Sequence, residues 1–472
     1  MTRAFQDLRF ASFAAALVVS AGCGVVGAAS PTAGLALFAV VGVTTLAVLA
    51  APRARLFGVR YADGVVAGAM LILPLAPYFS KVVPGFTGLR FALAAALAGG
   101  LLAGVIPAQR GWSRGLGVLV LAFLAFQVVP MLLAGANSYA ILRFLNWVMF
   151  VPLAFVQFDR RMVRVAASAA VIVTVILLVG LLMQVGGVLP GVWGGLQIGG
   201  GAGIRPTYAR RFTSFLQNPN DLALFMLMMA VLVYVGFVVT RRPWPQRVAA
   251  GALAGFCVVG LLLASSRGAL LALPIAAAFL FVARQRRAVI TLAGSGLVVL
   301  LVMLPLVPRL QQSVVTGLES VVAVVGGTDS SVTSRTQTWA ERISSSQGGP
   351  LIGGGYGGYA DIPAGAIARA EERAALYQQL TVDNGWLKLL LEEGVIGLAL
   401  LGSVVVGALY LSLRHAIRRR DAVAAVCGAL IVAAVFRAFS VDVFDINPWN
   451  FALWTLVGVV RSLETSSEEP ST

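Results

Sequence analysis

Long apolar runs recur along the whole sequence, and they constrain the fold more than any other feature. Most are near the length, about 20 residues, that a helix needs to cross a hydrocarbon core about 30 Å thick. Hydrophobic residues make up 59% of the 472 positions and charged residues only 11%. Soluble domains carry about a quarter charged residues. The sequence therefore predicts an all-α fold, a polytopic bundle of transmembrane helices.

The loops between these runs alternate in charge, and this alternation sets the predicted topology. Arginine clusters such as Arg160, Arg161 and Arg164 fall in every second loop, and the positive-inside rule places those loops in the cytoplasm. We expect about 12 to 14 spans in the cytoplasmic (inner) membrane, with both termini in the cytoplasm. The spans lie near residues 10–29, 33–50, 62–79, 90–107, 116–134, 141–157, 165–188, 216–239, 248–264, 269–283, 288–307, 386–413, 421–440 and 448–461.

Charge, cysteine and histidine content exclude several classes of function. The net charge of +16 mostly reflects the basic loops, and no basic face interleaves with aromatic residues as in nucleic-acid-binding proteins. The three cysteines, Cys23, Cys257 and Cys427, each lie within a separate predicted span, and the only histidine, His415, lies in a basic cytoplasmic loop. This pattern predicts neither a disulfide framework nor a metal site, and we expect no cofactor.

Composition divides the chain into four parts. Residues 1–190 form N-terminal transmembrane helices, and residues 191–400 form a central region with one long polar outer loop over 308–385. Residues 401–461 form C-terminal transmembrane helices, and the acidic tail 462–472 is predicted to be disordered. The long outer loop contains two stretches typical of short amphipathic helices, one beginning near 334 and one at 364–380.

Basic residues outside the cytoplasmic loops are the most informative about function. Each arginine near a span costs a few kcal/mol unless a carboxylate or an anionic ligand compensates it. The residues are Lys81, Arg90, Arg143, Arg205, Arg210, Arg211, Arg267, Arg309, Arg335, Arg342, Arg369, Arg373, Lys388 and Arg437. Arg267 stands in the turn "ASSRGAL", where a guanidinium, a hydroxyl and glycine N–H groups suit phosphate oxygens. The alternative is that Arg267 is an interfacial residue whose side chain extends to water.

The stretch "DNGWLKLLLEEGVIG" begins with polar residues and continues as an apolar helix. Asp383 and Asn384 stand at its outer end, and Glu392 and Glu393 lie deeper, where at least one is expected to pair inside the bundle. Lys388 is spaced to pair with Glu392 on the same helix face. Upstream, the glycines of "PLIGGGYGGY" permit close backbone approach to a ligand, but the stretch lacks the lysine of a nucleotide-binding loop.

Four stretches together resemble the O-antigen ligase and O-antigen polymerase family of bacterial membrane glycosyltransferases. They are "RRFTSFLQNPND", "SSRGALL", "SRTQTWAERI…PLIGGGYGGY" and "DNGWLKLLLEEGVIGL", in the family's order within roughly residues 205–400. The resemblance implies an enzyme that works at the outer face of the membrane on a glycan linked to polyprenyl (undecaprenyl) diphosphate. It implies transfer to an acceptor sugar hydroxyl with no nucleotide sugar and no required metal, in lipopolysaccharide or exopolysaccharide assembly.

The resemblance also assigns roles to particular residues. It implies that Arg211 and Arg267 hold the diphosphate, with Arg210 and Arg335 as further candidates. Family ligases typically carry a histidine, the candidate base, just before the asparagine of the last motif, and here that position is Asp383. A carboxylate can also take a proton from a hydroxyl, so base catalysis remains open, while the departure favours a polymerase over a ligase. The alternative is that Asp383 caps the helix that follows.

Asn384, Trp339 and Tyr356 are candidate substrate-binding residues, because a polar amide and aromatic faces suit sugars. The alternative for the aromatic residues is that they anchor the chain at the membrane interface. A second function also remains open, a transporter or flippase of a lipid-linked glycan. Such a protein should carry ionisable residues near mid-membrane or interrupted helices at corresponding positions of two halves. The sequence instead concentrates its charges at one face, which favours the glycosyltransferase.

Overall fold

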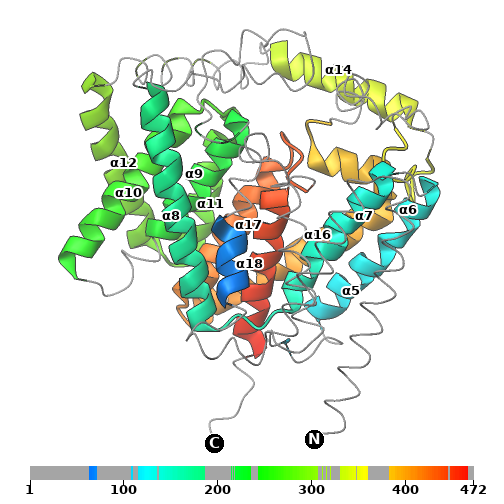
Figure 1. The fold of residues 1–472 in the computed structure, drawn as a ribbon, viewed down its shortest axis with the longest axis horizontal. Helices are drawn as coiled ribbons and strands as arrows, with labels where there is room; N and C mark the ends of the chain where they lie inside the picture. Colours follow the sequence, from blue (N-terminus) through cyan, green and yellow to red (C-terminus); the bar gives the residue numbers. More distant parts are fainter. Residues whose placement is uncertain are drawn as a thin grey trace, which may run out of the picture.

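The computed structural model describes residues 63–71, 108–109, 115–135, 138–185, 214, 216, 218–234, 243–306, 311, 315, 319, 330–346, 348–359, 382–444 and 447–465. Within these ranges the chain folds into helices and contains no strand. Besides the helical residues 63–71, the elements are α5 (Leu116–Phe126), α6 (Val128–Leu133), α7 (Ser138–Phe150), the 3-10 helix η2 (Val151–Phe155), α8 (Arg160–Val185), α9 (Pro219–Tyr234), α10 (Trp244–Leu263), α11 (Arg267–Val282), α12 (Arg286–Leu306), α14 (Ser330–Ser345), α16 (Gly385–Arg418), α17 (Ala422–Arg437) and α18 (Asn447–Thr465) (Figure 1).

The helices confirm the predicted all-α transmembrane bundle. Within the described ranges, five helices are long and apolar enough to cross a membrane, namely Leu116–Leu133, Arg160–Val185, Trp244–Leu263, Arg286–Pro305 and Gly385–Arg418. Shorter apolar helices occupy Tyr139–Phe155, Pro219–Val233, Arg267–Val282 and Ala422–Arg437. Each predicted span from residue 116 onward therefore coincides with a helix. The predicted spans 10–29, 33–50 and 90–107, and the predicted surface helix 364–380, lie outside the described residues.

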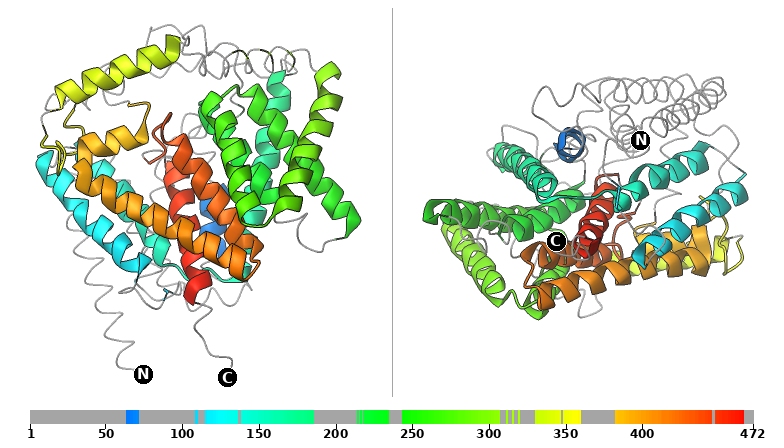
Figure 2. Two further views of the ribbon diagram at one scale, coloured as in Figure 1. Left: turned by 180° about the vertical axis from the view of Figure 1, so that it is seen from behind. Right: turned by 90° about the horizontal axis from the view of Figure 1, so that it is seen from below.

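The helices form two groups with α17 and α18 between them. Helices α8 to α12 lie on one side, and α5 to α7 lie on the other together with the beginning of α16 (Figures 1 and 2). α14 lies across one end of the bundle, and we call this end the α14 end (Figure 1). α14 confirms the amphipathic helix expected near residue 334. The predicted domain boundary at 400–401 falls inside α16, and α18 continues to Thr465, past the predicted end of the last span.

Aromatic and small side chains fix how these helices pack. Trp147 of α7 contacts Phe123 of α5 edge-on, with ring centroids 5.0 Å apart, and Trp454 of α18 at 6.4 Å. All three side chains are fully buried. Gly428 of α17 lies against the ring of Phe279 of α11, where a Cβ atom would overlap the ring. Small residues of this kind let membrane helices approach closely.

α16 is interrupted at Gly394, whereas the sequence predicted a continuous span in this region. Gly394 has φ 67° and ψ −168°, a conformation that a right-handed helix cannot contain and that glycine adopts without steric cost. The interruption frees backbone carbonyls on its N-terminal side. The carbonyls of Leu391 and Glu392 accept hydrogen bonds from the N–H groups of Gly354 and Gly355, at 2.9 and 3.0 Å.

Residues 348–359, which we call the glycine-rich segment, also supply hydrogen-bond partners on the C-terminal side of the interruption. The N–H groups of Val395 and Ile396 donate to the carbonyls of Pro350 and Leu351, at 2.9 and 3.1 Å. The segment therefore satisfies backbone groups inside the bundle that would otherwise lack partners in a bilayer. The backbone of these glycines does approach another group closely, as the sequence predicts. That group is the backbone of α16, whereas the sequence suggested a ligand.

Candidate active site

Arg335 and Asp383 face each other at the α14 end of the bundle. Arg335 lies on α14, Asp383 precedes α16, and the Nε and Oδ2 atoms are 3.6 Å apart. The two side chains are 34% and 51% exposed. An ion pair this open to solvent stabilises the fold little, so its main consequence is to fix where the two charges lie.

Arg267 lies close to this pair. It is the first residue of α11, and its positive charge is near enough to that of Arg335 for the two to repel each other. The preceding residue, Ser266, is buried and donates its hydroxyl to Oδ1 of Asn220 at 2.9 Å. This hydrogen bond joins the turn before α11 to the start of α9. Three separate segments thus bring two predicted phosphate ligands and the predicted base into one region.

Asn384, and not Asp383, is the N-cap of α16. The Oδ1 atom of Asn384 accepts a hydrogen bond from the N–H of Leu387 at 3.0 Å, and the Asn384 backbone is extended, with φ −156° and ψ 105°. The alternative that Asp383 caps the helix is therefore wrong. The cap leaves the Asp383 carboxylate half exposed beside Arg335, and it holds the amide of Asn384 in a buried position.

The charged residues deeper in α16 pair with other segments of the chain. Lys388 binds Asp442, with Nζ and Oδ2 2.8 Å apart, and its predicted pairing with Glu392 stays a prediction. Glu392 pairs with Arg143 of α7, with Nε and Oε2 3.3 Å apart. The expectation that at least one of the two glutamates pairs inside the bundle is confirmed.

The two aromatic candidates lie in contacts that hold the site together. Tyr356 is 1% exposed and donates its hydroxyl to Oε1 of Gln127 at 2.5 Å. Trp339 of α14 packs against a small buried cluster formed by Tyr359, Val382 and Leu391. A direct role of Trp339, Tyr356 or Asn384 in binding sugar stays a prediction.

Arg437 is a member of the site that sequence reasoning did not single out. It is 2% exposed at the end of α17, and its guanidinium and the hydroxyl of Ser440 occupy the space that a Cβ atom on Gly268 would need. Its charge also acts on Asp221 at the start of α9, which accepts a hydrogen bond from Trp449 at 3.0 Å. Arg437 was visible as a basic residue near the outer end of a predicted span, but its position beside Arg267 depends on how α11 packs against α17.

Arg210 and Arg211 lie outside the described residues, so their predicted contact with the diphosphate stays a prediction. Among the described residues, no group of three or more histidine, cysteine, aspartate or glutamate side chains is arranged to hold a metal ion. Cys257 and Cys427 are free and buried, in agreement with the small apolar role expected of buried cysteines.

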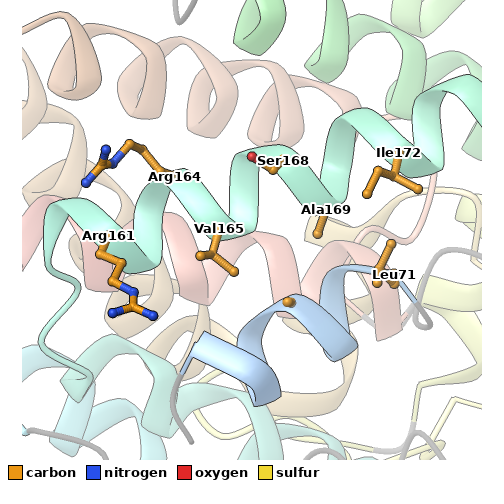
Figure 3. A pocket seen from close by; sticks show the side chains of 8 residues that line it. Leu71, Arg161, Arg164, Val165, Ser168, Ala169 and Ile172 are labelled. Atoms are coloured by element: carbon orange, nitrogen blue, oxygen red, sulfur yellow. The ribbon is translucent and has the colours of Figure 1, made fainter. Parts of the chain in front are cut away.

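A pocket of about 540 Å³ lies elsewhere, along the first half of α8 (Figure 3). Its lining residues come from α8 and from the helix 63–71, and they are Ala67, Leu71, Arg161, Arg164, Val165, Ser168, Ala169 and Ile172. Arg161 is already bound to Asp63, at 2.9 Å. None of the predicted site residues lines this pocket, so the charged region at the α14 end remains the candidate site.

One region of the chain is similar to a known protein family. No curated protein matches the sequence. A family model described as O-antigen ligase matches residues 252–402. The matched region runs from α10 into α16, and it includes Arg267, Arg335, the glycine-rich segment and Asp383. Residues 252–402 of this membrane protein are thus similar to the O-antigen ligase family, which confirms the resemblance found in the sequence.

Proposed function

We propose that the protein transfers a glycan from a polyprenyl-diphosphate-linked donor to an acceptor sugar hydroxyl at the outer face of the cytoplasmic membrane. The O-antigen ligase family region supports a membrane glycosyltransferase of the ligase or polymerase type. The carboxylate at the position of the family histidine favours the polymerase, which would lengthen a surface polysaccharide.

The convergence of Arg267, Arg335 and Asp383 is the observation that carries the proposal. Two guanidinium groups repel each other, and one carboxylate lies 3.6 Å from Arg335, so the three side chains together carry a net positive charge. A diphosphate would neutralise this charge, and guanidinium groups bind phosphate oxygens through paired hydrogen bonds.

In the proposed reaction, the acceptor oxygen forms a bond to the anomeric carbon while the bond from that carbon to the diphosphate oxygen breaks. Asp383 takes the proton of the acceptor hydroxyl as general base. Attack on the face opposite the leaving group inverts the anomeric configuration. The polyprenyl diphosphate leaves with additional negative charge, which Arg267 and Arg335 stabilise as it develops. Neither a nucleotide sugar nor a metal takes part.

The experiment uses purified protein in liposomes with a polyprenyl-diphosphate oligosaccharide and no nucleotide sugar, and products are separated by size. We expect Arg267→Ala to lower the transfer rate by about 100-fold or more, since the loss of one charge-stabilising donor typically has this effect. Arg267→Lys should restore little, because lysine offers a point charge in place of a planar fork.

Arg286→Ala is the matched control. Arg286 begins α12 as Arg267 begins α11, but it lies at the other end of the bundle, where its guanidinium stacks on Phe281 at 4.9 Å. This variant should transfer at the wild-type rate.

A ladder of longer glycans would identify a polymerase, and a single addition to an added acceptor would identify a ligase. Wild-type transfer by Arg267→Ala would exclude the diphosphate contact.

A transporter or flippase of the same lipid-linked glycan is the second candidate, and two observations favour it. α16 is interrupted at Gly394, and the ionisable residues Arg143, Lys388, Glu392 and Glu393 are buried within the bundle. Both features are typical of transporters. Here, however, the glycine-rich segment fills the interruption. Movement of the donor across the liposome bilayer without any product would support the transporter over the transferase.

A further inference from the structure

We propose that Glu392 is a positioning residue, whose buried carboxylate holds the glycine-rich segment on α16 and thereby keeps Arg335 opposite Asp383. This inference rests on the proposed function, because it assigns to Glu392 an effect on the transfer step. Glu392 does not approach the candidate site directly, since it lies nine residues further along the chain than Asp383, inside the bundle.

The Glu392 carboxylate joins two other parts of the chain. It is fully buried, and Oε1 accepts hydrogen bonds from the N–H of Gly357 at 3.1 Å and from the hydroxyl of Tyr139 at 3.2 Å. Oε2 accepts from Nε of Arg143 at 3.3 Å. α16, α7 and the glycine-rich segment therefore meet at a single carboxylate.

The main chain of Glu392 strengthens the same connection. Its carbonyl would bond the N–H of Ile396 in an uninterrupted helix, but Gly394 breaks the helix between them. The carbonyl instead accepts from Gly355 at 3.0 Å. Glu392 thus binds the glycine-rich segment through both its side chain and its backbone.

Glu393 provides a second, indirect connection to the segment. Its Oε2 accepts from Nε2 of Gln127 at 3.0 Å, and Oε1 of Gln127 accepts from the Tyr356 hydroxyl at 2.5 Å. The Glu393 carboxylate reaches the segment by way of Gln127, whereas the Glu392 carboxylate accepts a hydrogen bond from the segment itself. We therefore assign the larger positioning effect to Glu392.

A short path links the segment to the charges of the site. The segment follows α14 closely in the chain, and the Ser345 hydroxyl at the end of α14 donates to the carbonyl of Tyr359 at 3.2 Å. Trp339 of α14 packs against Tyr359 and Val382, the residue before Asp383. A shift of the glycine-rich segment would move α14, and with it Arg335, relative to Asp383. Misplacement of reacting groups by about 1 Å is enough to slow catalysis by about 100-fold.

The first test measures transfer by Glu392→Gln, which keeps an oxygen acceptor for Gly357 but removes the charge that compensates Arg143. We expect kcat to fall by about 10-fold or more, while the KM for the donor changes by less than about two-fold, because Arg267 on α11, outside α14 and the glycine-rich segment, still binds the diphosphate. Asp63→Asn is the matched control. It breaks another carboxylate–arginine pair, with a carboxylate side chain 2% exposed and bound to Arg161, but far from the glycine-rich segment, and it should leave kcat unchanged.

The second test measures geometry without catalysis. Arg335→Cys and Asp383→Cys are combined in a chain whose Cys23, Cys257 and Cys427 are replaced by serine, and a short bifunctional thiol reagent crosslinks the pair. Adding Glu392→Gln should slow the crosslinking by about five-fold, because the effective concentration of the second thiol falls as α14 moves. Adding Asp63→Asn should not slow the crosslinking.

Tyr139→Phe is the reserve variant if Glu392→Gln does not fold. It removes one hydrogen-bond donor to Glu392 and keeps the aromatic ring, and it should slow the crosslinking by about two-fold.

Unchanged kcat in Glu392→Gln would overturn the proposal. So would a loss of transfer with an unchanged crosslinking rate, because Glu392 would then act by another route than positioning. If the wild-type protein transfers no glycan, the proposed function fails, and the crosslinking rates alone decide whether Glu392 and Tyr139 hold α14 in place.

Discussion

Asp383 and Asn384 are adjacent in sequence but have separate tasks in the structure. The amide of Asn384 is engaged in the N-cap of α16, and the carboxylate of Asp383 lies half exposed beside Arg335. A carboxylate engaged in the cap would have fewer lone pairs left to accept the proton of a substrate hydroxyl. The division of tasks therefore leaves Asp383 available as a base and places it at the end of a fixed helix.

This division predicts different results for substitutions at the two positions. Asp383→Asn and Asp383→Ala should each lower the transfer rate by about 100-fold or more, because both remove the base. Neither should change the melting temperature of the purified protein. Asn384→Ala should lower the stability by about 1 kcal/mol through loss of the cap. Thermal unfolding in detergent, measured beside transfer in liposomes, checks both parts, and full activity of Asp383→Asn would contradict the role of Asp383.

At the scale of elements, the interruption of α16 determines how the glycine-rich segment meets the bundle. Gly394 ends the regular hydrogen bonding of the helix, and the glycine-rich segment supplies the missing partners on both sides of the break. An uninterrupted α16 would leave the segment without these partners. The part of the chain that carries Arg335 is thereby attached to a membrane helix by backbone hydrogen bonds as well as by the Glu392 side chain.

The interruption predicts that Gly394→Ala destabilises the protein and Gly402→Ala does not. A Cβ atom at Gly394 would overlap the carbonyl of Leu351, and the positive φ adds strain, whereas at Gly402 of the same helix nothing lies within 4 Å. We expect Gly394→Ala to cost about 1–3 kcal/mol or more. Gly402→Ala should be neutral or slightly stabilising. The melting temperatures of the two variants decide this, and equal values would contradict the role given to the interruption.

At the scale of the whole molecule, the candidate site lies at one end of the bundle. α14 lies across this end (Figure 1), and α9, α11 and α16 begin at the residues that form the site. Helix N-termini carry partial positive charge, so their charge adds to that of the arginines there. The arginines near the beginning of α8 and the end of α16 lie at the opposite end, where the positive-inside rule expects the cytoplasm.

The arrangement predicts which positions face the outside of the cell. In a chain with its native cysteines replaced by serine, Glu341→Cys on α14 should react with a membrane-impermeant maleimide added to intact cells, because Glu341 is exposed. Arg419→Cys, exposed after α16, should react only after the membrane is permeabilised. The opposite pattern would place the candidate site in the cytoplasm and contradict the proposed function.

The sequence by itself determined where the helices lie and which charged residues to examine. Each apolar run near 20 residues must satisfy its backbone internally to cross a bilayer, so helices follow from local composition, and all the predicted spans within 116–461 occur as helices. Arg267 could be chosen because a charge beside an apolar run is unusual whatever its partner, while Arg335 and Asp383 were chosen because their stretches resemble the family's motifs.

Only the tertiary structure decided how the charges pair and where α16 breaks. Lys388 is spaced to reach Glu392 along one helix face, yet Glu392 binds Arg143 of α7, and Lys388 binds Asp442. Hydrophobicity is a property of each segment and can be evaluated locally. The partner of a buried charge depends on which distant segments lie beside it, and the conformation of Gly394 depends on whether another segment supplies the hydrogen bonds that the helix loses.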